Sequence, residues 1–384
     1  MVIRGATVLH VDRLEAEMDL RIADGRILEV DPRLETAAGE ERFEAEGLLA
    51  LPGLIDIHTH GLRSESVQDG SLREYGRMQL EQGVTACVPT LYGPPQTNRR
   101  RMREAMRETD DLKLTPNILG FRPEIMYVAK TGAGSAASLS AIQQDTTLAL
   151  YEAAKGRIPI WDVSPELDGA IPFIRWAVGK GIVVSLAHTR ATVEQARRAV
   201  DAGLSLVTHL YDTFDLAEQT DPGVYPAGLT DYLLVEDRVT VEIIPDGVHV
   251  HPLLVEKTLR CKGLERVALV TDSLRGSGNP PGVYDGLAAG ERIAVTPDRG
   301  MRRVSDDALS GSCLTHLQSF RNAVRLFGRS VREASILCSR NQARLLGLPK
   351  GCLAAGLEAD LILLDERLEL VATFLAGRAV YQRR

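Results

Sequence analysis

The sequence has few of the features that mark secreted or membrane-bound proteins. Its five cysteines are scattered and odd in number, without Cys-x-x-Cys spacing, so neither a disulfide framework nor a cysteine metal cage is expected. No apolar run reaches the roughly 18 residues of a membrane span. Residues 1–5 lack the apolar core of a signal peptide. We therefore expect a cytoplasmic protein.

Concentrated positive charge is also missing. The chain has 45 Lys and Arg against 52 Asp and Glu, a net charge of -7, and the two signs are well mixed. Nucleic acid needs a basic patch and an anionic membrane needs a polybasic run, and neither is present. We therefore expect a small-molecule substrate, with no nucleic-acid or membrane partner.

What the chain does have is length and alternating apolar runs. With 384 residues and a hydrophobic share of 44%, it can build one large α/β domain and a smaller one. From about residue 52 to 350, strand-like runs alternate with helix-like ones, which indicates a parallel sheet. The eight strand-like runs predict a closed (β/α)8 TIM-type barrel. They are residues 54–60, 84–91, 118–125, 158–163, 182–188, 204–210, 239–244 and 267–271.

Both chain ends read as short strands. In residues 1–50, the turn at residues 23–26 between two β-rich runs is a hairpin signal. The last thirty residues repeat this pattern, and neither end alone buries enough to be stable. We therefore predict a small β-domain from residues 1–50 plus 353–384, and a barrel domain from residues 51–352.

Three further segments carry local signals. Capping boxes at residues 192–195 and 330–333 predict helices that end at Gly203 and near Leu346. Residues 274–309 are rich in Gly and Pro and long for a connection, so we expect a functional loop or small insertion beside the site.

The first predicted strand of the barrel ends in His58-Thr59-His60. Side chains repeat their direction every second residue of a strand, so both imidazoles point to the same side and can share a ligand. By itself, a chance histidine pair at a strand end is an equally good explanation.

Other predicted strands also end in potential metal ligands, and the carboxyl ends of barrel strands are where chemistry occurs. Such clustering favours a metal site over a structural role. Imidazoles and carboxylates suit a divalent ion such as zinc, and the carboxylate of Glu124 can bridge two ions. The predicted ligands are His58, His60, Glu124, His188, His209 and Asp272.

Two of the residues near the strand ends can take part in catalysis. A bound ion lowers the pKa of its water to about 7. Asp272 can take the proton of that water and pass it to a leaving nitrogen, the alternative being a strand-end cap. His249 can polarise the substrate carbonyl, although residues 249–251 could instead help to start a helix at Pro252.

Together these residues resemble the amidohydrolase superfamily, and within it the deacetylases of sugar phosphates. The likeness spans nearly the whole chain and implies a divalent-metal hydrolase that removes an acetyl group from an amino sugar. It implies one ion on Glu124, His188 and His209, a second held by the first-strand histidines, and a homodimer. The matching stretches are residues 52–61, 187–192, 207–211, 246–252, 270–272, 309–312, 341–347 and 359–361.

The chain departs from this family where the resemblance implies contacts to a sugar phosphate. Asp212 stands where the family has Asn, and the phosphate-binding Arg falls at Thr220 or Asp221. A carboxylate repels a phosphate dianion, so the metal chemistry carries over better than the 6-phosphate. The resemblance thus gives His249 and Asp212 as substrate contacts. Arg122, Arg190 and Arg275 are candidates for new anion contacts, with solvated surface arginines as the alternative.

We therefore predict a metal-dependent amide hydrolase that removes an acyl group from an amino sugar or a similar N-acyl substrate. Related barrels open cyclic amides or imides, or deaminate small molecules, and this alternative stays open. A non-catalytic protein with a decayed site is a third possibility, against which the intact ligand set argues.

Overall fold

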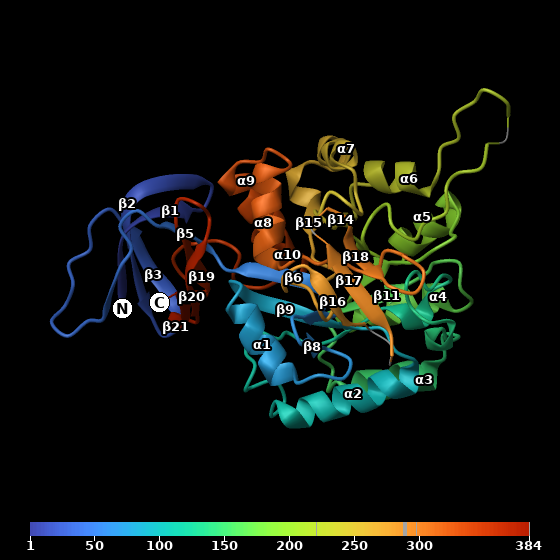
Figure 1. Cartoon of the computed structure of the whole chain (residues 1–384), viewed down its shortest axis with the longest axis horizontal. Helices are drawn as coiled ribbons and strands as arrows, with labels where there is room; N and C mark the ends of the chain where they lie inside the picture. The colour runs from blue at the N-terminus through green and yellow to red at the C-terminus, as the bar shows by residue number, and fades with distance from the viewer. Residues whose placement is uncertain (220, 287–289, 297, 384) are drawn as a thin grey trace.

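The computed structural model describes residues 1–219, 221–286, 290–296 and 298–383. Figure 1 shows a small sheet at one end of the molecule, where both termini lie, and a larger barrel with helices around it. None of the helices in the described ranges combines the length and the apolar character needed to cross a membrane.

Strands from both ends of the chain form the small sheet, as predicted. The order is β21-β20-β19-β5-β1-β2-β3, and β4 pairs with β1. The strands are β1 (Val2–His10), β2 (Arg13–Ala23), β3 (Arg26–Asp31), β4 (Arg42–Glu44), β5 (Leu49–Pro52), β19 (Leu361–Leu364), β20 (Leu370–Leu375) and β21 (Arg378–Gln382). The predicted hairpin joins β2 to β3, with Asp24 and Gly25 both at positive φ.

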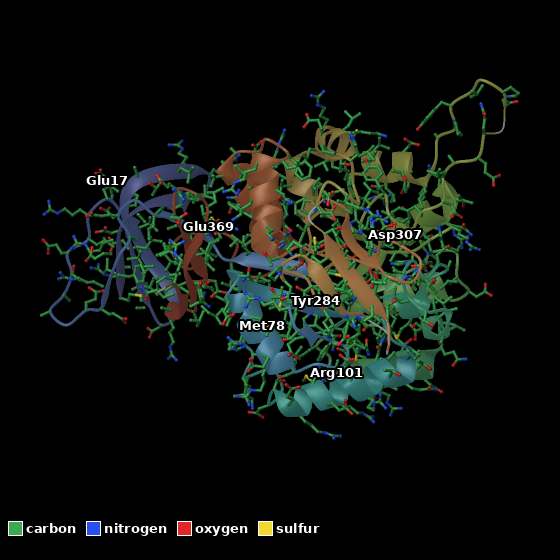
Figure 2. The ribbon with its side chains drawn as sticks, in the orientation of Figure 1. Glu17, Met78, Arg101, Tyr284, Asp307 and Glu369 are labelled. Carbon is green, nitrogen blue, oxygen red and sulfur yellow. The ribbon has the colours of Figure 1, made fainter. Side chains whose placement is uncertain are left out.

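The sheet needs both ends because its core is shared between them. Ile3 and Leu20 from the first strands pack with Leu363 and Phe374 from the last ones, and all four side chains are fully buried. The sheet also contacts the barrel, where Glu369 pairs with Arg321 of α8 (His316–Arg325) at 2.6 Å. Figure 2 labels Glu369 between the small sheet and this helix.

Eight parallel strands form the barrel, which confirms the predicted fold class. They pair in two runs, β6-β9-β10 and β11 to β15 in order. Phe121 N donates to Arg157 O at one junction, and Asp272 N donates to His58 O at the other, so the ring closes. The strands are β6 (Leu54–Thr59), β9 (Val84–Leu91), β10 (Arg122–Pro123), β11 (Ile160–Val163), β12 (Val183–Leu186), β13 (Leu206–Val207), β14 (Thr240–Ile243) and β15 (Val267–Leu269).

The third barrel strand is much shorter than the predicted residues 118–125. Only Arg122–Pro123 pairs as a strand, with a separate bridge between Cys87 and Ile118. Gly120 interrupts the run: its φ is 155°, and a Cβ there would lie 2.4 Å from Arg157 O. The backbone therefore bends before it delivers Glu124 to the barrel mouth.

Helices surround the strands, and both predicted capping boxes are present. Thr192 caps α5 and Ser330 caps α9. The helix opened by Ser330 continues through a π-helical turn at Ile336–Arg340 into α10. The helices are α1 (Leu72–Leu80), α2 (Pro95–Glu108), α3 (Gln144–Ala153), α4 (Ala170–Gly179), α5 (Val193–Asp201), α6 (Leu229–Val235), α7 (Pro252–Lys262), α8, α9 (Val331–Ser335) and α10 (Asn341–Leu345).

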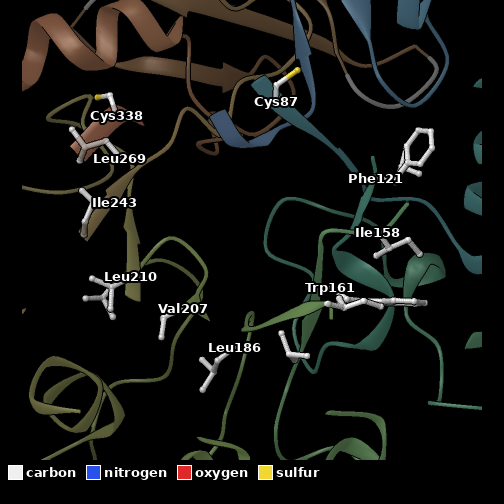
Figure 3. Packing of buried hydrophobic residues seen from close by; sticks show 14 of the residues in the cluster. Cys87, Phe121, Ile158, Trp161, Leu186, Val207, Leu210, Ile243, Leu269 and Cys338 are labelled. Atoms are coloured by element: carbon white, nitrogen blue, oxygen red, sulfur yellow. The ribbon is translucent and has the colours of Figure 1, made fainter. Parts of the chain in front are cut away.

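A large apolar core holds strands and helices together. Figure 3 shows buried side chains from several of its elements, among them Trp161 of β11, Leu186 of β12 and Cys338 of the π-helical turn. Burial of apolar surface at this scale is the main driving force for folding, and it fixes the strand ends in space. The site that they carry is therefore built on a rigid frame.

The long segment after β15 forms a small sheet of its own. It contains β16 (Gly282–Asp285), β17 (Arg292–Thr296) and β18 (Gly300–Arg303), paired antiparallel. Ile293 and Met301 of this sheet pack on Leu274, and Figure 2 labels Tyr284 of β16 and Asp307 beyond β18. The segment is thus an insertion that begins at the barrel mouth, as predicted.

Candidate metal centre

Glu124, which follows β10, has four imidazoles around its carboxylate. Its Oε1 lies 3.0 Å from Nε2 of His188 and 3.4 Å from Nε2 of His209. On the other side, Nε2 of His58 lies 3.5 Å from Oε1, and Nε2 of His60 lies 3.3 Å from Oε2. The carboxylate that the sequence places at the end of the third strand thus lies at the centre of the cluster.

Asp272, which follows β15, completes the cluster. Its Oδ1 lies 3.1 Å from Nε2 of His60 and 3.5 Å from Nε2 of His58. Two overlapping triplets have donor atoms close enough for one cation each: His58 with His60 and Asp272, and His58 with Glu124 and His209. The structure therefore brings all six predicted ligands together in the barrel mouth.

Three of these residues have an unusual backbone conformation. His188, His209 and Asp272 have φ angles of 45°, 25° and 48°, and each comes shortly after its strand. Non-glycine residues seldom adopt positive φ, and each such residue costs of order 1–3 kcal/mol. Such strain is typical of functional sites, where the surrounding fold imposes it.

The six candidate ligands are buried, and imidazoles lie beside carboxylates throughout the cluster. Burial by itself would lower the pKa of His60, but its hydrogen bonds with Asp272 and Glu124 raise that pKa to about 10. Burial would also lower the pKa of His209, but its hydrogen bond with Glu124 raises that pKa to about 10. Burial favours the neutral form of Asp272, yet nearby His58 lowers its pKa to about 2. The carboxylates of Glu124 and Asp272 therefore favour positive charge in the space between them and the imidazoles.

A divalent cation would supply this positive charge. The Nδ1 of His60 donates to Thr90 O at 2.9 Å, so Nε2 is the ring nitrogen that faces the carboxylates and could bind a cation. The Nε2 of His58 is buried without any hydrogen-bond partner in the part of the chain that the structure describes. A buried polar atom without a partner calls for an explanation, and imidazole nitrogens beside carboxylates are common ligands of divalent metal ions.

Beneath the cluster lies a buried network that the sequence did not reveal. Arg122 Nε and Nη2 donate to the carboxylate of Asp162 on β11 at 2.7 and 2.8 Å, and its Nη1 donates to Glu242 on β14 at 2.6 Å. The other oxygen of Glu242 lies 3.1 Å from Nδ1 of His58. Arg122 is fully buried, so neither an anion contact nor a surface role is correct for it.

The two histidines near α7 have different roles. His249 lines the cavity above the cluster, and its Nδ1 lies 2.6 Å from Oδ2 of Asp246. Burial would lower the pKa of His249, but Asp246 raises it, which favours a charged imidazole. His251 instead caps α7, accepting from Leu253 N at 3.2 Å. Helix capping therefore describes His251, and His249 remains the candidate for a substrate contact.

The cavity above the cluster has a volume of about 200 Å³. Asp212 and Thr213 line one wall, and Leu309 and Ser310 line another. The insertion that follows β15 therefore helps to enclose the site. Thr220, one of the two positions considered for a phosphate-binding Arg, lies outside the described residues, and Asp221 is exposed.

Arg190 and Arg275 do not line this cavity, which corrects the expectation that they contact substrate. The Arg190 side chain is 65% exposed, with Asp215 3.9 Å away. The Arg275 guanidinium pairs with Asp69. Strand-end position indicated these residues, but their side chains lie beside carboxylates that are not part of the cavity lining, Asp215 and Asp69.

Comparison with known proteins adds to this geometry. The model of the Amidohydrolase family matches residues 49–380. An N-acetylglucosamine-6-phosphate deacetylase of Lysinibacillus sphaericus is 30% identical, over 98% of this chain and 97% of that protein. An N-acetylgalactosamine-6-phosphate deacetylase of Escherichia coli is 28% identical, over 98% of each. The crystal structure of N-acetyl-D-glucosamine-6-phosphate deacetylase from Mycobacterium smegmatis is 29% identical with a TM-score of 0.87, covering 99% of this chain and all of that one.

Proposed function

Because the chain belongs to the amidohydrolase family and is a hydrolase of amide C–N bonds, we propose that it removes an acyl group, acetyl in the first place, from an amino sugar or a similar N-acyl substrate. The observation that carries this proposal is the convergence of four imidazoles on the carboxylate of Glu124, with Asp272 in the same cluster. Relatives that match nearly the full length are deacetylases of N-acetylated sugars.

The six clustered residues would hold a divalent cation, with zinc as the proposed metal and room for one or two ions. When bound, such an ion activates water and polarises the amide carbonyl. Asp272 then accepts a proton from the attacking water and delivers it to the leaving nitrogen. Its Oδ1 lies 3.1 Å from Nε2 of His60, among the residues that would hold the ion.

His249 stabilises the negative charge that develops on the carbonyl oxygen. Asp246 holds Nδ1 of this residue, so Nε2 is the ring nitrogen available to the substrate. A preorganised donor of this kind lowers the barrier because it needs no rearrangement as the charge develops. His249 is thus the proposed oxyanion contact.

The experiment that tests this proposal measures acetate release from a panel of N-acetyl sugars and N-acyl amines. Protein loaded with zinc is compared with protein stripped by a chelator, and the metal content of both is measured. We expect acetate from the loaded protein alone. Ammonia or a ring-opened product from cyclic amides, without acetate, would support ring opening or deamination instead.

We further propose that the enzyme works in the cytoplasm as a homodimer, without nucleic-acid or membrane partners. The dimer follows from the resemblance to family members that pair in this way. Light scattering on the eluting protein should give twice the 41.9 kDa mass of the chain. A monomer at micromolar concentration would contradict this part of the proposal.

A further inference from the structure

An unpaired carboxylate lines the cavity outside the proposed ligand set. Asp212 is half-buried, and its side chain accepts no hydrogen bond and forms no ion pair with any other described residue. Its backbone N–H donates to His209 O at 3.0 Å, so Asp212 ends the turn that begins at this candidate ligand. A carboxylate that faces a cavity without a partner is available to a ligand.

The backbone holds Asp212 in place. Tyr211 and Thr213, on either side of it, have φ angles of 80° and 61°. The Tyr211 hydroxyl lies 2.8 Å from Oγ1 of Thr258 on α7, which anchors the segment to the barrel. The orientation of Asp212 toward the cavity is therefore set by the fold.

In the described part of the chain, the cavity lining offers no lysine or arginine side chain to a phosphate. No Lys or Arg occurs among its lining residues within the described ranges. Nearby cations are paired with carboxylates: Lys130 with Asp215 at 2.7 Å and Arg303 with Asp306 at 2.7 Å. The charge of His249 is likewise matched by Asp246.

We propose that the substrate presents a hydrogen-bond donor, a hydroxyl or an ammonium group, to Asp212, and that it carries no phosphate. This inference rests on the proposed function and names its substrate class. Ionised carboxylates form strong hydrogen bonds with such donors. A phosphate dianion at the same place would be repelled by Asp212, and no described Lys or Arg side chain of the cavity lining would offset this repulsion.

The kinetic test compares N-acetylglucosamine, its 6-phosphate and N-acetylputrescine as substrates of the metal-loaded enzyme. Repulsion between the phosphate and Asp212 at contact distance corresponds to at least a tenfold loss of kcat/KM. We therefore expect kcat/KM of the better unphosphorylated compound to exceed that of the 6-phosphate by about tenfold or more. Faster turnover of the sugar identifies a hydroxyl donor, and faster turnover of the diamine identifies an ammonium donor. A higher kcat/KM for the 6-phosphate overturns the inference while leaving the proposed function intact.

Substitution of Asp212 tests the residue itself. Asp212→Asn keeps the shape but removes the charge, so it should reduce the preference against the 6-phosphate by about tenfold. Asp168→Asn removes one charge from an exposed residue that does not line the cavity, and it should leave the preference unchanged. An unchanged ratio in Asp212→Asn would refute the role given to this carboxylate.

A binding measurement separates this inference from catalysis. Calorimetric titration of metal-loaded Asp272→Asn protein with the sugar and with its 6-phosphate does not depend on turnover. We expect tighter binding of the unphosphorylated sugar even if no acetate is released from any compound. Tighter binding of the 6-phosphate overturns the inference, whereas absence of acetate release from the wild-type enzyme counts against the proposed function alone.

Discussion

The Nδ1 of His58 lies 3.1 Å from Oε2 of Glu242, and both side chains are fully buried. Burial would raise the pKa of Glu242, but the adjacent guanidinium of Arg122 lowers it, so the carboxylate is ionised and can only accept. The hydrogen bond therefore holds the proton of His58 on Nδ1 and points Nε2, as a free ligand atom, toward Glu124 and Asp272. Carboxylates behind ligating histidines commonly set the tautomer in this way.

We predict that Glu242→Gln weakens metal binding by about 10–100-fold, because the amide cannot fix this tautomer while also pairing with Arg122. Competition with a chromogenic chelator measures the affinity. Glu265→Gln, which changes an exposed glutamate paired with Arg344, is the matched control and should bind metal normally. Equal affinities in the two variants would show that Glu242 does not orient His58.

We predict that Arg122→Lys destabilises the folded protein by about 3–5 kcal/mol, because a lysine cannot reproduce the paired contacts to Asp162 and Glu242 and leaves buried carboxylates undercompensated. Urea unfolding monitored by circular dichroism measures the loss. Arg190→Lys, on the surface, should change stability by no more than about 0.5 kcal/mol. A small effect at Arg122 would mean that the network relaxes around the shorter side chain.

We predict that Gly132→Ala disturbs the metal centre. Gly132 has a φ of 56°, and a Cβ there would lie 2.9 Å from Cε1 of His188. Gly181→Ala is the control, since Gly181 has a φ of 76° and no atom near its would-be Cβ. Both changes should destabilise the fold by about 1 kcal/mol through backbone strain. Only Gly132→Ala should also lower metal content and acetate release.

We predict that Asp272→Asn lowers kcat by about 10²–10⁴-fold, because the amide cannot accept the proton of the attacking water. Glu124, His188 and His209 are unchanged in this variant, so metal retained on them separates lost proton transfer from lost metal. Single-turnover acetate release with parallel metal analysis makes this comparison. Turnover at the wild-type rate would exclude Asp272 as the proton-transfer group.

The clustering of the candidate ligands could be predicted because these residues follow simple rules of position. His58 and His60 share a strand face, and Glu124, His188, His209 and Asp272 follow apolar runs, so the barrel pattern alone brings them to one end. These are short-range signals that a single sequence carries. The closed fold and the small sheet were predictable for the same reason.

What could not be predicted depends on which way a side chain turns within the barrel. Asp162 and Glu242 stand inside apolar runs, where an acid gives no sign of its partner. Arg122 resembles a strand-end arginine, yet its side chain is fully buried, whereas Arg190 and Arg275 lie beside Asp215 and Asp69 and do not line the cavity. Residue type and spacing do not encode such choices, because long-range packing decides them.

The left-handed backbone at His188, His209 and Asp272 lowers the stability of the folded chain at the residues of the candidate metal centre. Glycine is the residue that suits such a conformation, so His188→Gly should be more stable than His188→Ala by about 1 kcal/mol, although neither can ligate a metal. At these three positions, glycine would make the folded chain more stable but would remove the side chains that are proposed to bind the metal. The residues that build the candidate metal centre are thus the ones whose replacement would make the chain more stable, a trade-off between stability and activity.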